Sequence, residues 1–200
     1  DRAIDAADSL RLISRVGVGL DSVDLAAARR GAIAVAYTPE APADAVAELT
    51  IGMALSLLRG VHLANQAIRH GVWRRLQGRR LARVTVGVVG VGRIGGRVIK
   101  LLSAFGGRIL GNDLTRAPVD ELNRRGANVE WAEFGTLLRE SDIVTLHVPL
   151  TRGTSHLVGA GELAVMRRDA LLINTCRGGV VDEAALATAL RAGRLGGAAV

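Results

Sequence analysis

The stretch TVGVVGVGRIGGRV, residues 85–98, decides the fold of this chain. An apolar, β-branched run enters the pattern G-x-G-x-x-G at Gly90, Gly92 and Gly95, and a helical pattern follows. Asp113 stands at the end of the next apolar segment, about 20 residues further on. A strand, a glycine turn, a helix and this acid together are the fingerprint of a βαβ unit that binds a dinucleotide.

Each residue of this fingerprint has a physical role. Gly90 permits the tight turn, Gly92 lets the backbone approach a pyrophosphate, and Gly95 lets the helix pack close to the sheet. The pyrophosphate would rest on backbone amides at the positive end of the helix that begins near Arg93. The Asp113 carboxylate would accept hydrogen bonds from both ribose hydroxyls and repel a 2′-phosphate, which favours NAD over NADP.

Two other interpretations of the glycine motif remain open at this point: a structural turn without a ligand, and a methyltransferase-type nucleotide site. Strand-like and helix-like segments alternate along the chain, which predicts a doubly wound parallel sheet with helices on both faces. Besides the unit that begins at Val84, we expect strands at 12–16, 33–36, 108–112, 128–130, 143–147 and 170–175 and helices at 25–30, 43–59, 63–70, 94–105, 119–125, 133–140, 161–166 and 182–192.

The composition argues against several classes of protein. The formal charge is +7, but the arginines are scattered and aromatic residues make up only 2%, so we expect no nucleic-acid partner. The single cysteine, Cys176, allows no internal disulfide, which suits a reducing cytoplasm. We find no signal peptide and no apolar run of membrane-spanning length. Neither end resembles a natural terminus, so we expect a fragment or a cropped chain.

Three segments together resemble the D-isomer-specific 2-hydroxyacid dehydrogenases, with phosphoglycerate dehydrogenases nearest in appearance. They are SRVGVGLDSVD at 14–24, VVGVGRIG at 88–95, and HVPLT at 147–151 continued by INTCRGGVVDE at 173–183. Their order and spacing match the family over nearly the whole chain. The resemblance implies a Rossmann-type dinucleotide domain at 46–200, a hinge helix at 43–59, and at 1–45 a remnant of a flavodoxin-like substrate domain. It also implies a homodimer and excludes the methyltransferase alternative.

The resemblance also assigns the site. Arg177 becomes the catalytic arginine, because a guanidinium at the carboxyl end of a strand can hold a carboxylate bidentately and polarise a carbonyl. The resemblance implies substrate contacts at Arg15, Val16, Gly17 and Val18, where a glycine-rich turn exposes backbone amides. The resemblance implies coenzyme contacts at Thr50, Gly90, Gly92, Arg93, Ile94, Gly95, Asp113, His147, Val148, Pro149, Thr175, Cys176 and Arg177. We expect no metal site.

The side chains of His147 and Cys176 are of types that often act in catalysis, but we assign neither of them a catalytic role. The resemblance makes His147 a loop residue at the coenzyme edge and not the general base. Cys176 has no visible base partner, and hydride transfer needs no nucleophile. The family completes its site with a glutamate and a histidine that follow the strand beginning near Leu195, and this chain ends before either.

Some positions depart from the family pattern. Ser22 replaces the usual Asn, and Leu114 replaces the usual Pro after Asp113. Arg116 lies near enough in sequence to reach a 2′-phosphate, so NADP is a possible second coenzyme. The expected function is hydride transfer between NAD(H) and a D-2-hydroxyacid/2-oxoacid pair, with 3-phosphoglycerate as a candidate substrate. One alternative is an NADH-sensing, corepressor-like protein. A second alternative, an enzyme that oxidises phosphite, is disfavoured because no lysine stands in the first loop.

Overall fold

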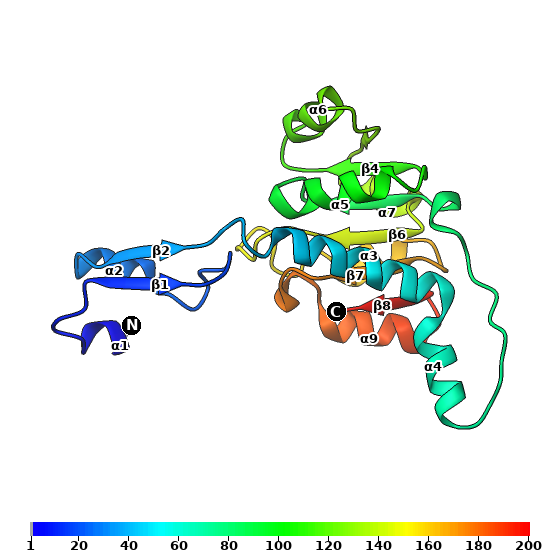
Figure 1. The fold of residues 1–200 in the computed structure, drawn as a ribbon, viewed down its shortest axis with the longest axis horizontal. Helices are drawn as coiled ribbons and strands as arrows, with labels where there is room; N and C mark the ends of the chain where they lie inside the picture. The colour runs from blue at the N-terminus through cyan, green and yellow to red at the C-terminus, as the bar shows by residue number, and fades with distance from the viewer. Residues whose placement is uncertain (1) are drawn as a thin grey trace. The chain divides into compact units, whose positions relative to one another are not determined.

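The computed structural model describes residues 2–200, which form two compact units (Figure 1). One unit ends at Ala45, and the other is Val46–Val200. The assignment of the first unit to a substrate domain stays a prediction.

The smaller unit contains two parallel strands joined through a helix. Its elements are α1 (Arg2–Asp5), β1 (Leu12–Arg15), α2 (Leu25–Arg30) and β2 (Ala34–Tyr37). β1 pairs with β2 so that Leu12 lies opposite Ala34. Asp24 caps α2, because its side chain accepts a hydrogen bond from the Ala27 amide at 2.8 Å. The short α1 was not predicted from the sequence.

The larger unit alternates strands and helices, as the sequence predicts. α3 (Ala43–Arg59) crosses the boundary between the units. It is followed by α4 (Val61–Arg69), η1 (Leu81–Arg83), β3 (Val86–Val89), α5 (Arg93–Ser103), β4 (Ile109–Asn112), α6 (Ala117–Arg124), β5 (Glu130–Trp131), α7 (Phe134–Glu140), β6 (Ile143–Leu146), α8 (Ala160–Val165), β7 (Leu171–Asn174), η2 (Gly178–Val180), α9 (Glu183–Arg191) and β8 (Gly197–Ala199).

The six strands of this unit form one parallel sheet in the order β5-β4-β3-β6-β7-β8. Counted along the unit, this is the 3-2-1-4-5-6 order of the doubly wound dinucleotide-binding fold. The strand order reverses between β3 and β6. Ligands of such sheets bind outside the carboxyl ends of the strands at this reversal, so the fold alone points to the loops after Val89 and Leu146.

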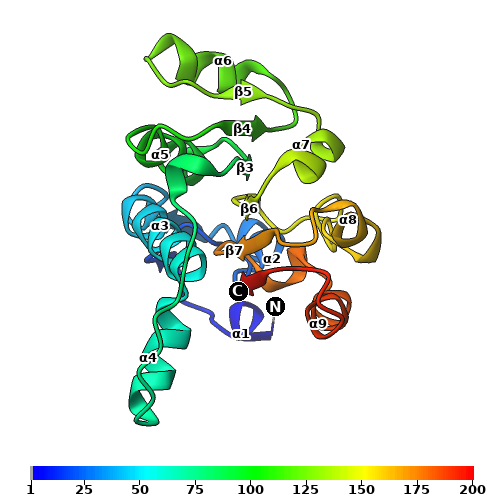
Figure 2. The same cartoon turned by 90° about the vertical axis from the view of Figure 1, so that its right-hand side faces the viewer.

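Helices cover both faces of the sheet (Figure 2). Alternate residues of each strand enter opposite cores: in β3, Val88 packs with α3, α5 and α6, while Val89 packs with α7, α8 and α9. β3, β6 and β7 are buried along their whole length. This double burial explains why these strands appear as continuous apolar runs in the sequence and not as alternating ones.

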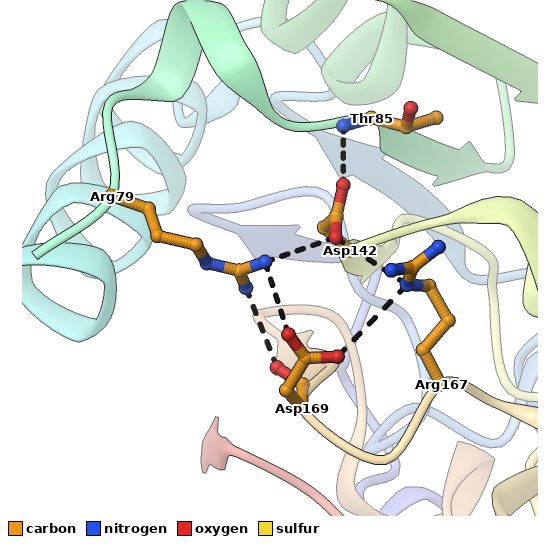
Figure 3. Close-up of polar contacts among 5 residues, drawn as sticks. All are labelled: Arg79, Thr85, Asp142, Arg167 and Asp169. Carbon is orange, nitrogen blue, oxygen red and sulfur yellow. Dashed lines mark hydrogen bonds and ion pairs between the residues drawn. The ribbon is translucent and has the colours of Figure 1, made fainter.

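The irregular segment after α4 is tied to the amino-terminal edge of the sheet by Arg79 (Figure 3). Its Nη1 donates to Asp142 Oδ1 at 3.0 Å and to Asp169 Oδ2 at 3.3 Å. Asp142 Oδ2 accepts from the Thr85 amide at 2.8 Å, and Arg167 Nε lies 3.5 Å from Asp142 Oδ1. The Asp142 side chain is 14% exposed and that of Asp169 is 63% exposed, so Asp142 is the centre of this network.

Within residues 2–200, no individual helix has the length and apolar composition of a span. α3 and α4, bent by 65° at their junction, pass that test of length and composition only when taken together.

Candidate coenzyme and substrate site

The turn after β3 has the backbone geometry that its glycines predict. Gly90 has φ +89°, and a side chain there would come within 2.5 Å of the His147 carbonyl oxygen. A Cβ on Gly95 would collide with the Gly90 carbonyl oxygen, whereas one on Gly92 would meet nothing within 4 Å. The turn is therefore closed beneath Gly95 and open at Gly92, where a pyrophosphate would need room. These residues fit a dinucleotide, and the coenzyme contacts of Arg93 and Ile94 stay predictions.

Asp113 follows β4 and is bound to the same turn. Its Oδ2 accepts from the Val91 amide and its Oδ1 from the Leu114 amide, both at 2.7 Å. An ionised carboxylate offers about four acceptor positions, so both oxygens retain capacity for ribose hydroxyls. The carboxylate thus also holds the glycine turn, a role that the sequence analysis missed because Val91 and Asp113 are 22 residues apart.

Arg116, the residue nearest in sequence for a 2′-phosphate, contacts its own helix. Its Nε forms an ion pair with Asp120 Oδ1 at 3.1 Å, and its guanidinium lies over the Trp131 ring, 6.0 Å from the centroid. Both charged side chains are about half exposed or more, so this pair is weak. The arrangement is compatible with NAD.

His147 lies at the carboxyl end of β6, beside the glycine turn. Its amide donates to the Val89 carbonyl at 2.7 Å, and its Nε2 lies 3.0 Å from Thr145 Oγ1. Its Nδ1 is buried and has no hydrogen-bond partner among the described residues. Burial lowers the pKa of His147 to about 4, so the imidazole is neutral at pH 7. The assignment of His147 to the coenzyme edge stays a prediction.

The residues after His147 border the same turn. Val148 is half-buried, and its Cγ1 would lie 2.9 Å from a Cβ on Gly90. Pro149 is exposed. The reversal point of the sheet therefore brings the predicted residues of the β3 and β6 loops together.

A cavity of about 490 Å³ lies at the carboxyl end of β7. It is lined by residues of α3, the loop after β7, α9 and the end of the chain: Val46, Leu49, Met53, Asn174, Thr175, Cys176, Arg177, Gly178, Glu183 and Val200. Thr50 is buried beside it and joins the two segments, because its Oγ1 lies 3.1 Å from Thr175 Oγ1. Thr50 and Thr175, predicted from distant segments, are thus brought together with Arg177.

The loop after β7 is organised around Asn174, which the sequence analysis did not single out. The Asn174 amide nitrogen donates to the Arg177 carbonyl at 2.8 Å, and its oxygen accepts from the Cys176 amide at 3.1 Å. The Cys176 thiol donates to the same oxygen at 3.0 Å, and burial raises its pKa. The sulfur is therefore a protonated, hydrogen-bonded thiol, which agrees with the prediction that it is no nucleophile. The available sequence signal was an asparagine that ends a buried strand.

The predicted substrate loop of the smaller unit has its own internal bonds. Gly17 has φ +133°, and its amide donates to Thr38 Oγ1 at 2.8 Å. Arg15 Nε donates to the Gly19 carbonyl, and Arg15 Nη1 donates to that of Val16. The Gly17 amide, which the sequence suggested for an anion, is therefore already paired with Thr38. Val16 and Val18 are exposed.

Within residues 2–200, no three His, Cys, Asp or Glu side chains lie close enough together to hold a metal ion.

Comparisons with known proteins agree with this geometry. The family model described as D-isomer specific 2-hydroxyacid dehydrogenase, NAD binding domain, matches residues 51–200. A glyoxylate reductase of Thermofilum pendens is 42% identical over 203 residues, covering 98% of this chain and 59% of its own length. A D-3-phosphoglycerate dehydrogenase of Methanocaldococcus jannaschii is 38% identical, covering 98% of this chain and 38% of its own length.

A solved structure agrees too. The D-lactate dehydrogenase of Aquifex aeolicus, complexed with NAD and lactic acid, superposes with a TM-score of 0.85 at 34% identity, over 94% of this chain and 56% of that one. The chain thus spans 38% to 59% of the length of these relatives.

Proposed function

The chain belongs to the D-isomer-specific 2-hydroxyacid dehydrogenase family, with NAD as coenzyme, and from this premise we propose that the protein transfers a hydride between NAD(H) and a D-2-hydroxyacid/2-oxoacid pair. The observation that carries the proposal is the pairing of an open glycine turn with Arg177 beside a cavity, both at the carboxyl edge of one sheet. The turn would hold the coenzyme, and the arginine would hold the oxoacid.

Bound NAD(H) would supply or accept the hydride. The chain's own residues bind and orient. The amides of Gly90 and Val91 already donate to the Asn112 carbonyl and to Asp113 Oδ2, so amides at the start of α5 would bind the pyrophosphate, and Asp113 would accept from the ribose. The Arg177 guanidinium binds the substrate carboxylate and stabilises negative charge that develops on the neighbouring carbonyl oxygen. Arg15, Val16, Gly17 and Val18 are proposed to contact the substrate from the smaller unit.

The substrate pair is a D-2-hydroxyacid and its 2-oxoacid, and the side chain of this pair differs among the relatives. The relatives are named for phosphoglycerate, glyoxylate, hydroxypyruvate and lactate. We propose 3-phosphoglycerate as one candidate, and glyoxylate as its main competitor because the glyoxylate reductase named above shares 42% identity.

The test is a substrate panel on the full-length protein, with NAD+ and NADP+ for the hydroxyacids and with NADH and NADPH for the oxoacids. The panel contains 3-phosphoglycerate, glycerate, glyoxylate, hydroxypyruvate and pyruvate, with turnover followed by absorbance. We expect turnover of at least one pair with NAD(H), and an Arg177→Ala variant that has lost most of it. NADH binding without turnover of any member would favour the rival function, an NADH-sensing, corepressor-like protein.

We further propose a homodimer formed through the larger unit. α4 has no buried residue among those described, and several large apolar side chains on it and just after it are more than half exposed: Val61, Leu63, Ile68, Val72 and Trp73. Apolar surface of this extent is typical of a protein interface.

The single thiol, Cys176, supports a reducing compartment such as the cytoplasm.

A further inference from the structure

Asn174 ends β7 with a buried polar side chain. The residue is 6% exposed, although an amide is costly to bury unless its hydrogen bonds are made. The structure supplies partners for both ends of this amide, and all of them lie in the next three residues. The nitrogen donates to the Arg177 carbonyl at 2.8 Å, and the oxygen accepts from the Cys176 amide at 3.1 Å.

These bonds fix the backbone that carries Arg177. The Arg177 carbonyl accepts a second hydrogen bond, from the Val180 amide at 3.1 Å. The Arg177 side chain is linked to the same loop, because its Nη1 donates to the Cys176 carbonyl at 2.7 Å. The Asn174 amide thus bonds to the backbone on both sides of the Arg177 Cα, and the guanidinium bonds to the Cys176 carbonyl within the same stretch of backbone.

The other side of the loop is held by a separate contact. Thr50 Oγ1 uses its single proton to donate to the Val46 carbonyl at 2.8 Å. The bond between the two threonines must then be donated by Thr175 Oγ1, which lies 3.1 Å away. Thr50 anchors the start of the loop to α3, and Asn174 anchors its end to β7.

We propose that Asn174 is a positioning residue for the reaction: it acts through Arg177, by holding the guanidinium in the orientation that binds the oxoacid carboxylate. This inference rests on the proposed function. A misplacement of about 1 Å in a residue that orients the substrate costs roughly 100-fold in rate. Replacing Asn174 with alanine removes both ends of the amide and frees the loop to move by that amount.

The chain offers a matched control in Asn123, at the end of α6. Its amide nitrogen donates to the Val129 carbonyl at 2.8 Å, and its oxygen accepts from the Val129 amide at 3.0 Å. This is the same pair of bonds, made to a loop that carries none of the proposed site residues. Asn123→Ala therefore reports what losing such a clamp does to stability alone.

The experiment is a double-mutant cycle in the full-length protein. The variants are Asn174→Ala, Arg177→Ala, the two combined, and Asn123→Ala. For each we measure kcat and KM for the best 2-oxoacid of the panel, the dissociation constant of NADH, and that of oxalate as an unreactive carboxylate probe. Asn174→Ser is a rescue variant, because its hydroxyl can accept from the Cys176 amide as the asparagine oxygen does.

We expect Asn174→Ala to lower kcat/KM by about 100-fold and to weaken oxalate, with NADH affinity and the Asn123→Ala kinetics unchanged. In the Arg177→Ala background the same change should cost no more than about twofold, because the two residues act as one unit. Asn174→Ser should recover part of the loss, and it carries the test if Asn174→Ala does not fold.

Losses that multiply in the double variant, or an Asn174→Ala enzyme as active as Asn123→Ala, would overturn the inference and leave the proposed function standing. A wild type without turnover, or an Arg177→Ala variant as active as wild type, would overturn the proposed function, and the inference with it.

Discussion

Asp113 accepts hydrogen bonds from the turn and is also the proposed acceptor for the ribose. We expect Asp113→Ala to raise the dissociation constant of NADH by about 10- to 100-fold, because hydrogen bonds to a charged group contribute about 1.5–3 kcal/mol. Fluorescence titration with NADH and NADPH measures this. Asp120→Ala is the control, since Asp120 pairs with the exposed Arg116 and not with the turn. Unchanged NADH affinity in Asp113→Ala would contradict the assignment.

Because of His147, we expect the stability of the fold to depend on pH in the acidic range. Its pKa is about 4 in the native protein, below the ordinary value of 6.5, because the ring is buried. Between these values the unfolded chain binds a proton that the native chain does not, so stability falls as the pH falls from about 6.5 to about 4. The loss attributable to this ring is on the order of 1–3 kcal/mol.

Urea unfolding at a series of pH values measures this effect. We expect His147→Gln to flatten the decline between pH 6.5 and 4, and the control His62→Gln, at an exposed position on α4, to keep it. Identical slopes for wild type and His147→Gln would show that other groups cause the decline.

At the scale of elements, two neighbouring glycines of α5 differ in whether there is space for a side chain. A Cβ on Gly95 would collide with the Gly90 carbonyl oxygen, whereas one on Gly96 would meet only Leu122 methyl groups, at 3.7 Å. We expect Gly95→Ala to lower the melting temperature and weaken NADH binding. Gly96→Ala should be neutral or stabilise by up to about 1 kcal/mol, since alanine is the better helix former. Thermal melts and NADH titration decide, and equal effects of the two changes would refute this account of the turn.

The link between the segment after α4 and the sheet provides a second test at this scale. Asp142→Ala removes the Arg79 ion pair and leaves the Thr85 amide without its acceptor, so we expect a loss of about 2 kcal/mol in the free energy of unfolding. Asp169→Ala, at a largely exposed position, should cost less than about 0.5 kcal/mol. Denaturant unfolding compares them, and similar losses would mean that Asp142 is not the centre of the network.

The helices and strands show what the sequence can and cannot predict. The glycine motif and buried runs predicted β3, β6 and β7 to within a residue or two, because these strands are apolar on both faces. β5 was expected at 128–130 and lies at Glu130–Trp131. It is a two-residue edge strand whose limits depend on pairing with β4 and not on its own pattern. The bonds of Asp113 to Val91 and of Gly17 to Thr38 join distant segments, so no local pattern reveals them.

At the scale of the whole molecule, the strand order brings together motifs that lie far apart in the sequence. It places the glycine turn, His147 and the Arg177 loop along one edge of a sheet, although they come from three separate segments. The sequence resemblance predicted these residues as a set. The amide clamp at Asn174 and the contact between Thr50 on α3 and Thr175 after β7 appear only in the folded chain, because their partners are determined by packing.

The proposed dimer has its own test. Trp73 is 83% exposed and Ile68 is 53% exposed. We expect Trp73→Glu combined with Ile68→Glu to convert a dimer into a monomer with little change in thermal stability of the larger unit, because neither side chain packs in its core. Sedimentation velocity measures the mass. His62→Glu, on the same helix, is the control for added charge, and a wild type that sediments as a monomer would refute the dimer.

The contact between Thr50 and Thr175 joins positions 125 residues apart. A ribosome releases the chain from its first residue onward, so the nascent polypeptide carries a finished glycine turn and its carboxylate long before β7 emerges. The part of the site that would bind the oxoacid through Arg177 is therefore completed after the part that would bind adenosine. A chain interrupted between those two moments would contain the residues proposed to bind adenosine but would lack Arg177.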